Sequence, residues 1–276
     1  MLEIIVPTYN RHEAIDRLIK DLSFQEDLNF RLNIIDQSKI PYKNIYETNF
    51  EVNVSWIPSI KSPILARHYG FQKSKEDVFL FLDDDMIPDK NLVKNVNLIF
   101  NEYLEPLVLG GISNVRPQNK FEKFFRFLFQ RGIYKDPRYD YFKKSYEKKY
   151  YKVPSFLCTP YISASILAVN RKALEKNSFP INFKNHILGG DIYYGMTCLK
   201  KNIRVCISYL LRAQEIENKN FKFKSIKGYK KIMLSFHSAL LVLKINGINL
   251  KNIFHFFLRI LLICLFLIRL LVLQLI

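Results

Sequence analysis

Three consecutive aspartates, Asp83 to Asp85, follow an apolar run in the segment FLFLDDDMIP at residues 79–88. Neighbouring carboxylates repel one another, so such a cluster is tolerable at a ligand-binding edge if a divalent cation sits among them. Carboxylate oxygens suit Mg²⁺ or Mn²⁺, whose coordination is usually completed by water and by substrate phosphates. The cluster indicates either a metal that bridges to a diphosphate or a solvated turn, where aspartate is common as a helix cap.

Hydrophobic periodicity in the first half of the chain predicts alternating strands and helices. We expect strands at 2–7, 30–36, 52–57 and 77–83, and helices at 12–22, 63–75 and 88–103. This order predicts an open, mainly parallel sheet with helices on both sides. Ligands bind such sheets beyond the carboxyl ends of the strands. The polar residues expected at those ends are Thr8, Tyr9, Asn10 and Arg11, then Asp36, then Asp83 to Asp85.

The chain has 276 residues and a formal net charge of +17, which favours anionic partners such as nucleic acid, acidic lipid or phosphorylated small molecules. The length allows one large domain or one domain with an appendage. The four cysteines are scattered without metal-type spacing, which fits a reducing compartment. The first predicted strand is followed by neither a Walker A sequence nor GxGxxG, which counts against P-loop and dinucleotide-binding proteins.

Lysine, arginine and aromatic residues dominate residues 120–154, where the spacing predicts an amphipathic helix followed by a basic, tyrosine-rich loop. Such a surface could stack bases and hold phosphates, and it would suit a membrane interface equally well. The interpretation we favour is an insertion that packs on the core and also contacts a membrane.

Residues 253–276 are almost wholly apolar and follow a basic segment at 219–231. About 20 apolar residues can span a bilayer, but Arg259 and Arg269 would each cost roughly 2.5–3.5 kcal/mol at the centre of a spanning helix. A spanning helix, a helix in the membrane plane and a buried or oligomer-forming helix remain open. If the segment spans, the positive-inside rule leaves the rest of the chain in the cytoplasm. We therefore expect a protein on the cytoplasmic face of the cell membrane, peripheral or with one C-terminal anchor.

Five segments, in this order, resemble the motifs of family 2 glycosyltransferases: IIVPTYNR at 4–11, IIDQS at 34–38, ARHYG at 66–70, FLDDDMIPD at 81–89 and GGDIYYGMTCLKKNIRV at 189–205. The resemblance covers about residues 2–210. It implies an α/β fold of the GT-A (Rossmann-like) type, a mainly parallel open sheet flanked by helices. The implied units are a GT-A domain at 1–215, with 113–155 as an acceptor-side insertion, and membrane-associating helices at 216–276.

The resemblance also implies a binding site for a UDP- or dTDP-sugar donor. Its donor-contacting residues would be Pro7, Thr8, Tyr9, Arg11, Asp36, Arg67, Asp83 and Asp84. The loop at 7–9 would pack around the base, and Asp36 would accept a hydrogen bond from the ring N–H of uracil or thymine. Arg67 would approach the base or the diphosphate, and Asp84 would contact the ribose or another part of the donor.

The same resemblance implies a Mn²⁺ or Mg²⁺ cofactor and a catalytic base. Asp85 matches the metal ligand best, and Asp83 completes the DxD pattern and would assist it. Asp191 matches the base, which takes the proton from an acceptor hydroxyl in a single displacement that inverts the anomeric centre. Gly190 departs from the family pattern, because an acidic residue usually stands there.

The implied function is sugar transfer to a hydroxyl of a lipid-linked or surface-glycan acceptor in envelope polysaccharide synthesis. The alternative is a non-catalytic, basic α/β protein that binds nucleic acid or an anionic membrane. Carboxylates gathered at the ligand edge would repel a nucleic-acid backbone, so we expect no nucleic-acid partner. A nucleotidyltransferase would use similar groups, but it usually has a glycine-rich loop where this chain has PTYNRHE.

Overall fold

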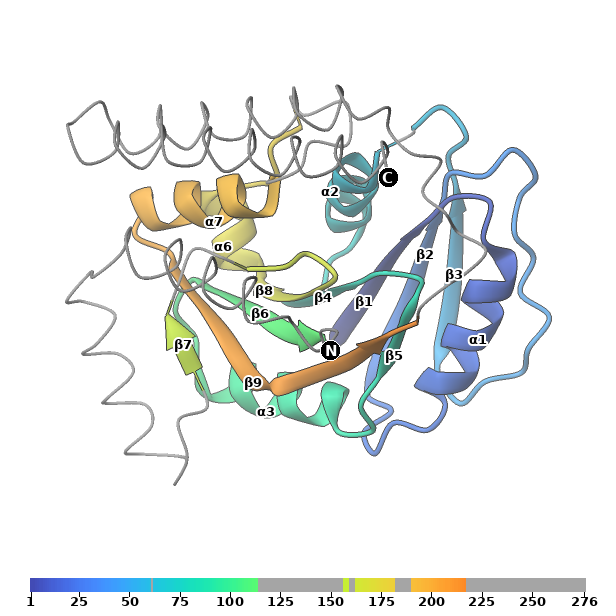
Figure 1. Cartoon of the computed structure of the whole chain (residues 1–276), viewed down its shortest axis with the longest axis horizontal. Coiled ribbons are helices and arrows are strands. Elements are labelled where there is room, and N and C mark those ends of the chain that lie inside the picture. The colour runs from blue at the N-terminus through green and yellow to red at the C-terminus, as the bar shows by residue number, and fades with distance from the viewer. Residues whose placement is uncertain (61, 114–155, 159–161, 182–189, 217–276) are drawn as a thin grey trace, which may run out of the picture.

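A computed structural model describes residues 1–60, 62–113, 156–158, 162–181 and 190–216. A nine-stranded sheet runs through this part of the chain, and helices pack against both of its faces (Figure 1). The strands are β1 (Leu2–Thr8), β2 (Phe30–Asp36), β3 (Glu51–Trp56), β4 (Val78–Leu82), β5 (Met86–Pro88), β6 (Leu107–Ser113), β7 (Phe156–Cys158), β8 (Ile166–Asn170) and β9 (Arg204–Glu215). The helices are α1 (His12–Leu22), α2 (Pro63–Lys73), α3 (Leu92–Glu102), α6 (Arg171–Lys176) and α7 (Gly190–Lys200).

The first half of the sheet is parallel, with the strands in the order β3, β2, β1 and β4. Every residue of β1 is buried, as expected for a strand covered on both faces. Helix α1 packs its apolar stripe on one face through residues that are at most 1% exposed: Ile15, Leu18, Ile19 and Leu22. Helix α2 covers the other face. The predicted alternation is confirmed, and α1 and β2 have the predicted bounds.

Helix α2 packs closely on β1 because Gly70 has no side chain. A Cβ atom at this position would lie 2.7 Å from Cγ2 of Ile5 and 3.2 Å from its Cδ1. This close packing fixes the height of the helix above the sheet. It therefore also fixes Arg67, which lies one turn earlier in α2.

The second half of the sheet is mixed, which differs from the expectation of a mainly parallel sheet. Strand β8 runs antiparallel between β4 and β6, while β5 and β7 pair antiparallel with β9. Strands β6 and β9 are parallel. The predicted α/β fold with flanking helices is confirmed, but the parallel arrangement belongs to its first half.

The carboxyl ends of β1, β2 and β3 lie level with one another. Thr8 is in register with Asp36, and Asp36 is in register with Trp56. Strand β4, parallel to β1, ends at Leu82 opposite Ile166, the first residue of β8. The aspartate triplet that follows β4 therefore lies at the same edge of the sheet.

Among the described residues, no helix has the length and apolar character needed to cross a bilayer. The predicted insertion at 113–155, apart from Ser113 at the end of β6, lies outside the described residues. So does the apolar segment at 253–276. The predicted division of the chain after residue 215 stays a prediction.

Candidate active site

The aspartate triplet forms the turn between β4 and β5. Asp84 accepts hydrogen bonds from Thr8 Oγ1 at 2.7 Å and from Arg11 Nη1 at 2.8 Å. The same nitrogen of Arg11 lies 3.0 Å from Oδ2 of Asp85. One guanidinium therefore offsets the repulsion between two neighbouring carboxylates.

Asp84 is the buried member of the triplet, with 4% of the residue exposed. Burial raises the pKa of its carboxyl group, while Arg11 and the hydroxyl of Thr8 lower it. Both of its carboxylate oxygens are bonded within the protein. Asp84 therefore ties the turn to the end of β1, in addition to its predicted role at the donor.

Asp83 and Asp85 are more open, with 30% and 26% of their side chains exposed. Their oxygens are of the kind that Mg²⁺ and Mn²⁺ prefer. Among the described residues, no group of three or more His, Cys, Asp or Glu side chains could hold a metal ion. Asp83 and Asp85 each also contact an arginine, and an ion bound to these two carboxylates would complete its coordination with water and a bound diphosphate, as Mg²⁺ usually does.

Asp36 is completely buried, with 0% of the residue exposed. Its Oδ1 accepts from the amide of Ser38 at 2.9 Å, and its Oδ2 accepts from the amide of Tyr42 at 2.7 Å. The side chain thus holds the loop after β2, as aspartates commonly do in turns. The hydrogen bond that a base N–H is predicted to donate to Asp36 would require this loop to move, because the carboxylate is enclosed.

Ser38 connects the ends of three strands. Its Oγ accepts from the amide of Asn10 at 2.7 Å, and its carbonyl oxygen accepts from Nε1 of Trp56 at 2.9 Å. Asn10 has a φ of 54°, in the left-handed region that asparagine tolerates better than most residues. The amide of Gln37 also donates to the carbonyl oxygen of Thr8 at 3.0 Å. The loops at this edge are therefore fixed to one another by hydrogen bonds.

The three residues of the predicted base-packing loop differ in exposure. Pro7 is buried within β1, and Thr8 is 2% exposed and bonded to Asp84. Tyr9 lies just beyond the strand and is 42% exposed. Tyr9 is therefore the member of this loop that a ligand can reach directly.

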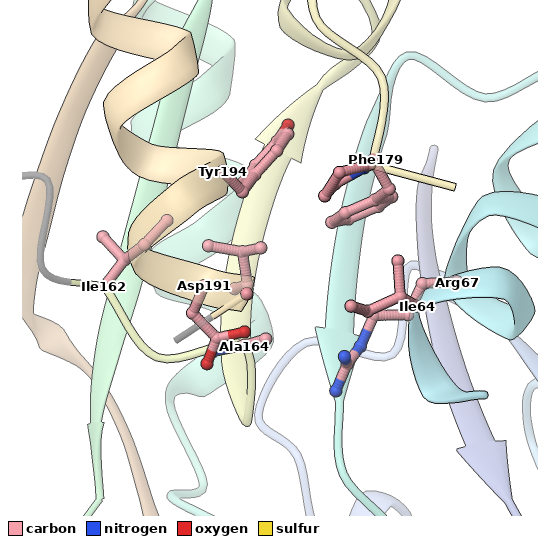
Figure 2. A pocket seen from close by; sticks show the side chains of 10 residues that line it. Ile64, Arg67, Ile162, Ala164, Phe179, Asp191 and Tyr194 are labelled. Atoms are coloured by element: carbon pink, nitrogen blue, oxygen red, sulfur yellow. The ribbon is translucent and has the colours of Figure 1, made fainter. Parts of the chain in front are cut away.

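Arg67 and Asp191 line one pocket on the α2 side of the sheet (Figure 2). Nη2 of Arg67 donates to Oδ1 of Asp83 at 2.5 Å. Asp191, in the first turn of α7, accepts a hydrogen bond from the amide of Ala164 at 3.1 Å. Figure 2 shows the guanidinium of Arg67 and the carboxylate of Asp191 at the same end of the pocket. The hydroxyl of Tyr194 points to the opposite end.

The pocket is narrow, with a volume of about 10 Å³, which is room for about one water molecule. Apart from Arg67 and Asp191, its wall is largely apolar: Ile64, Ile162, Ala164, Leu167, Phe179, Pro180, Gly190 and Tyr194. A Cβ atom at position 190 would lie 3.2 Å from Cδ1 of Ile64. Glycine therefore relieves crowding at the position where the family usually has an acid.

The electrostatics of Asp191 suit a general base. Burial raises the pKa of its carboxyl group, and the charge of Asp83 raises it further. The charge of Arg67 and the amide of Ala164 act in the opposite direction. A raised pKa makes the carboxylate a stronger base, while Arg67 favours the ionised form that can accept a proton.

Residues 3–176 match the sequence model of the family described as glycosyl transferase family 2. This chain belongs to glycosyl transferase family 2. The resemblance predicted from the five motifs is confirmed. The matched range contains the predicted donor and metal residues, and Asp191 lies beyond its end.

Two curated relatives come from Haemophilus influenzae, and each is named an uncharacterized glycosyltransferase. One is 35% identical over 128 residues, which is 42% of this chain and 43% of the relative. The other is 28% identical over 110 residues, which is 38% of this chain and 44% of the relative. The alignments therefore span less than half the length of either relative.

Solved structures share the fold at low sequence identity. Residues 1–349 of S. aureus TarS, in complex with UDP-GlcNAc, superpose with a TM-score of 0.57 at 16% identity over 91% of this chain and 69% of TarS 1–349. The mannosyltransferase PcManGT from Pyrobaculum calidifontis, in complex with GDP-Man and Mn²⁺, gives a TM-score of 0.60 at 14% identity over 92% of this chain and 68% of its own. These similarities confirm the GT-A fold of this family 2 chain.

The charged side chains predicted from the sequence lie at this edge of the sheet, and three other residues that form hydrogen bonds there were not predicted. The amide of Ala164 binds Asp191 from before β8, a strand that the apolar pattern did not identify. Ser38 stands within the segment IIDQS, yet nothing in that pattern indicates its three connections. Trp56 is the last residue of β3 and lies within the strand predicted at 52–57, so an aromatic residue near a ligand-binding edge was a signal that could have been used.

Proposed function

We propose that this chain is a metal-dependent, inverting glycosyltransferase that moves a sugar from a UDP- or dTDP-sugar to a hydroxyl of a lipid-linked or surface-glycan acceptor. The observation that carries the proposal is the order of chemical groups along one edge of the sheet. A nucleotide-sugar runs from base through ribose and diphosphate to sugar. The groups that suit these parts follow one another in the same order from β2 to β8.

At the base end are the loop held by Asp36 and the exposed ring of Tyr9. Arg11 and the triplet follow where β1 and β4 end, and they suit a diphosphate with a divalent ion. Arg67 and Asp191 come next, beside the start of β8. A donor laid along this edge would bring its anomeric carbon towards Asp191.

In this arrangement Asp191 would accept the proton of the acceptor hydroxyl as the hydroxyl oxygen bonds to the anomeric carbon. The bond from that carbon to the diphosphate oxygen breaks in the same step, which inverts the anomeric centre. Arg11 and Arg67 would lie near the negative charge that develops on the leaving diphosphate. Mn²⁺ or Mg²⁺, bound by Asp85 with help from Asp83, would supply further electrostatic stabilisation of that charge.

The choice of donor rests on the resemblance of Asp36 to a residue that favours uracil or thymine. Two fold neighbours were solved with UDP-GlcNAc and with GDP-Man, so the fold is compatible with more than one base. The curated relatives are named as glycosyltransferases, which supports sugar transfer as the reaction class. Their names specify neither the donor nor the acceptor.

We also propose that the enzyme works at the cytoplasmic face of the cell membrane, either peripherally or with one C-terminal anchor. The support comes from the sequence, where a basic segment at 219–231 precedes an apolar one at 253–276. A lipid-linked acceptor would be available at that surface.

The test is calorimetric titration of the full chain with UDP-, dTDP-, GDP- and CMP-sugars, with and without Mn²⁺. We expect metal-dependent binding of a uridine or thymidine donor, weakened at least tenfold in Asp85→Asn. Asp89→Asn is the matched control, because Asp89 is an exposed aspartate of the same segment and should bind like wild type. A folded wild-type protein that binds no donor, or binds equally well without metal, would contradict the proposal.

A further inference from the structure

We propose that Trp56 is the platform on which the nucleobase of the donor stacks. This inference rests on the proposed function, because it concerns the same donor site. Trp56 is the last residue of β3, the outermost strand on this side of the sheet. It is the sole tryptophan of the chain.

The position of Trp56 follows from the register of the parallel strands. Thr8, Asp36 and Trp56 are paired in register, so their side chains project from the same face of the sheet at the same level. Thr8 uses its side chain to bind Asp84 of the triplet. Trp56 therefore belongs to the row of side chains that continues from the diphosphate end of the site.

Exposure distinguishes Trp56 from the other two members of the row. Thr8 is 2% exposed and Asp36 is 0% exposed, whereas Trp56 is 48% exposed. Both oxygens of Asp36 are already bonded to backbone amides. A base that arrives beside this row would therefore meet the indole ring before it met the carboxylate.

A hydrogen bond at one edge of the indole fixes the orientation of the ring. Nε1 donates to the carbonyl oxygen of Ser38 at 2.9 Å, and Ser38 is itself held by Asp36 and Asn10. Because Ser38 follows β2, the ring leans over the end of that strand. Strand β3 itself lies three strand spacings, ~14 Å, from β4. A ring fixed in this way loses little conformational freedom when a base stacks on it.

The chemistry of the ring favours a base over the other parts of the donor. A planar aromatic ring stacks well on an indole, and such contacts tolerate any base because every base has a π-face. The carboxylates and arginines that suit the diphosphate are gathered at the other end of the row. Trp56 would therefore supply affinity for the base, while selection among bases would belong to other groups.

The test uses the fluorescence of the single tryptophan together with calorimetry on the full chain. UDP and dTDP are titrated in the presence of Mn²⁺ into wild type, Trp56→Phe and Trp56→Leu. Phe24→Leu is the control, because Phe24 is a 76% exposed aromatic residue that follows α1 at the opposite end of the parallel strands. Circular dichroism confirms that each variant is folded.

We expect nucleotide to quench the wild-type emission with the same dissociation constant that calorimetry gives. Trp56→Leu should bind roughly tenfold or more weakly, Trp56→Phe should lose less affinity, and Phe24→Leu should bind like wild type. Wild-type affinity in folded Trp56→Leu, or binding without any change of emission, would overturn this inference and leave the proposed function intact. Failure of wild type to bind any nucleotide would overturn both.

Discussion

Arg67 is placed between two carboxylates that belong to different elements. It bonds to Asp83 after β4, and its charge acts on Asp191 in α7. Only 5% of Arg67 is exposed, so little water screens these interactions. The guanidinium therefore connects the diphosphate end of the proposed site to the proposed base.

The pH dependence of turnover should reveal the effect of the Arg67 charge on Asp191. If Asp191 is the base, the rate should rise with pH as its carboxyl group loses a proton, because only the carboxylate can accept one. Arg67 lowers the pKa of Asp191. Arg67→Gln should therefore move the rising limb of kcat/KM to higher pH.

Arg67→Lys is the matched variant for this measurement, because it keeps the positive charge and should shift the rising limb less. Donor turnover is followed from pH 4 to pH 9 in all three proteins. Rising limbs that coincide in wild type and Arg67→Gln would show that Arg67 does not act on the group that titrates.

Helix α2 carries Arg67 to the site, and its distance from the sheet depends on Gly70. Alanine at this position would place a methyl group 2.7 Å from Cγ2 of Ile5, so the helix or the strand must shift. Overpacking of this kind costs about 1–3 kcal/mol, which over most of that range exceeds the roughly 1 kcal/mol that alanine gains over glycine within a helix.

We predict that Gly70→Ala lowers the melting temperature and weakens donor binding, because the shift displaces Arg67. Gln72→Ala, at an exposed position of the same helix, is the control and should change neither quantity measurably. Thermal unfolding and donor titration check both variants. A Gly70→Ala protein as stable as wild type would show that the close approach of α2 is not needed.

The elements that the sequence predicted well have strong periodic patterns. Helix α1 has apolar residues at helical spacing and a polar outer face, and β1 and β2 are short apolar runs, so their positions follow from burial alone. Strands β6 and β8 are also largely buried, but their sequences, LVLGGIS and ILAVN, gave no strand prediction. Their direction depends on connections through distant parts of the chain, which a local pattern does not contain.

The side chains of the site were predictable for a different reason. Charged residues at the carboxyl ends of strands are costly to bury without a ligand or a partner, so they stand out in the sequence. Their pairing was not predictable. Arg11 pairs with both Asp84 and Asp85, and Asp36 is fully enclosed by its own loop. Both arrangements depend on backbone positions that only the fold defines.

At the scale of the whole molecule, the net charge of +17 should govern contact with membranes. Anionic lipid attracts basic segments by about 1 kcal/mol per Lys or Arg near the surface, and salt screens this attraction. We predict that the full chain sediments with vesicles containing phosphatidylserine and binds them less as salt rises. Equal binding to neutral vesicles at every salt concentration would contradict an electrostatic contribution.

The measurement that tests the central claim most directly is donor turnover by Asp191→Asn compared with wild type. The donor is the nucleotide-sugar that wild type binds, and release of the nucleoside diphosphate is followed with Mn²⁺ present. We predict that Asp191→Asn binds the donor within about threefold of wild type, since Asp191 lies beyond the diphosphate end of the site, but turns it over at least 100-fold more slowly. Turnover at the wild-type rate would contradict the role of Asp191 as the base and the direction in which the donor is laid along the sheet.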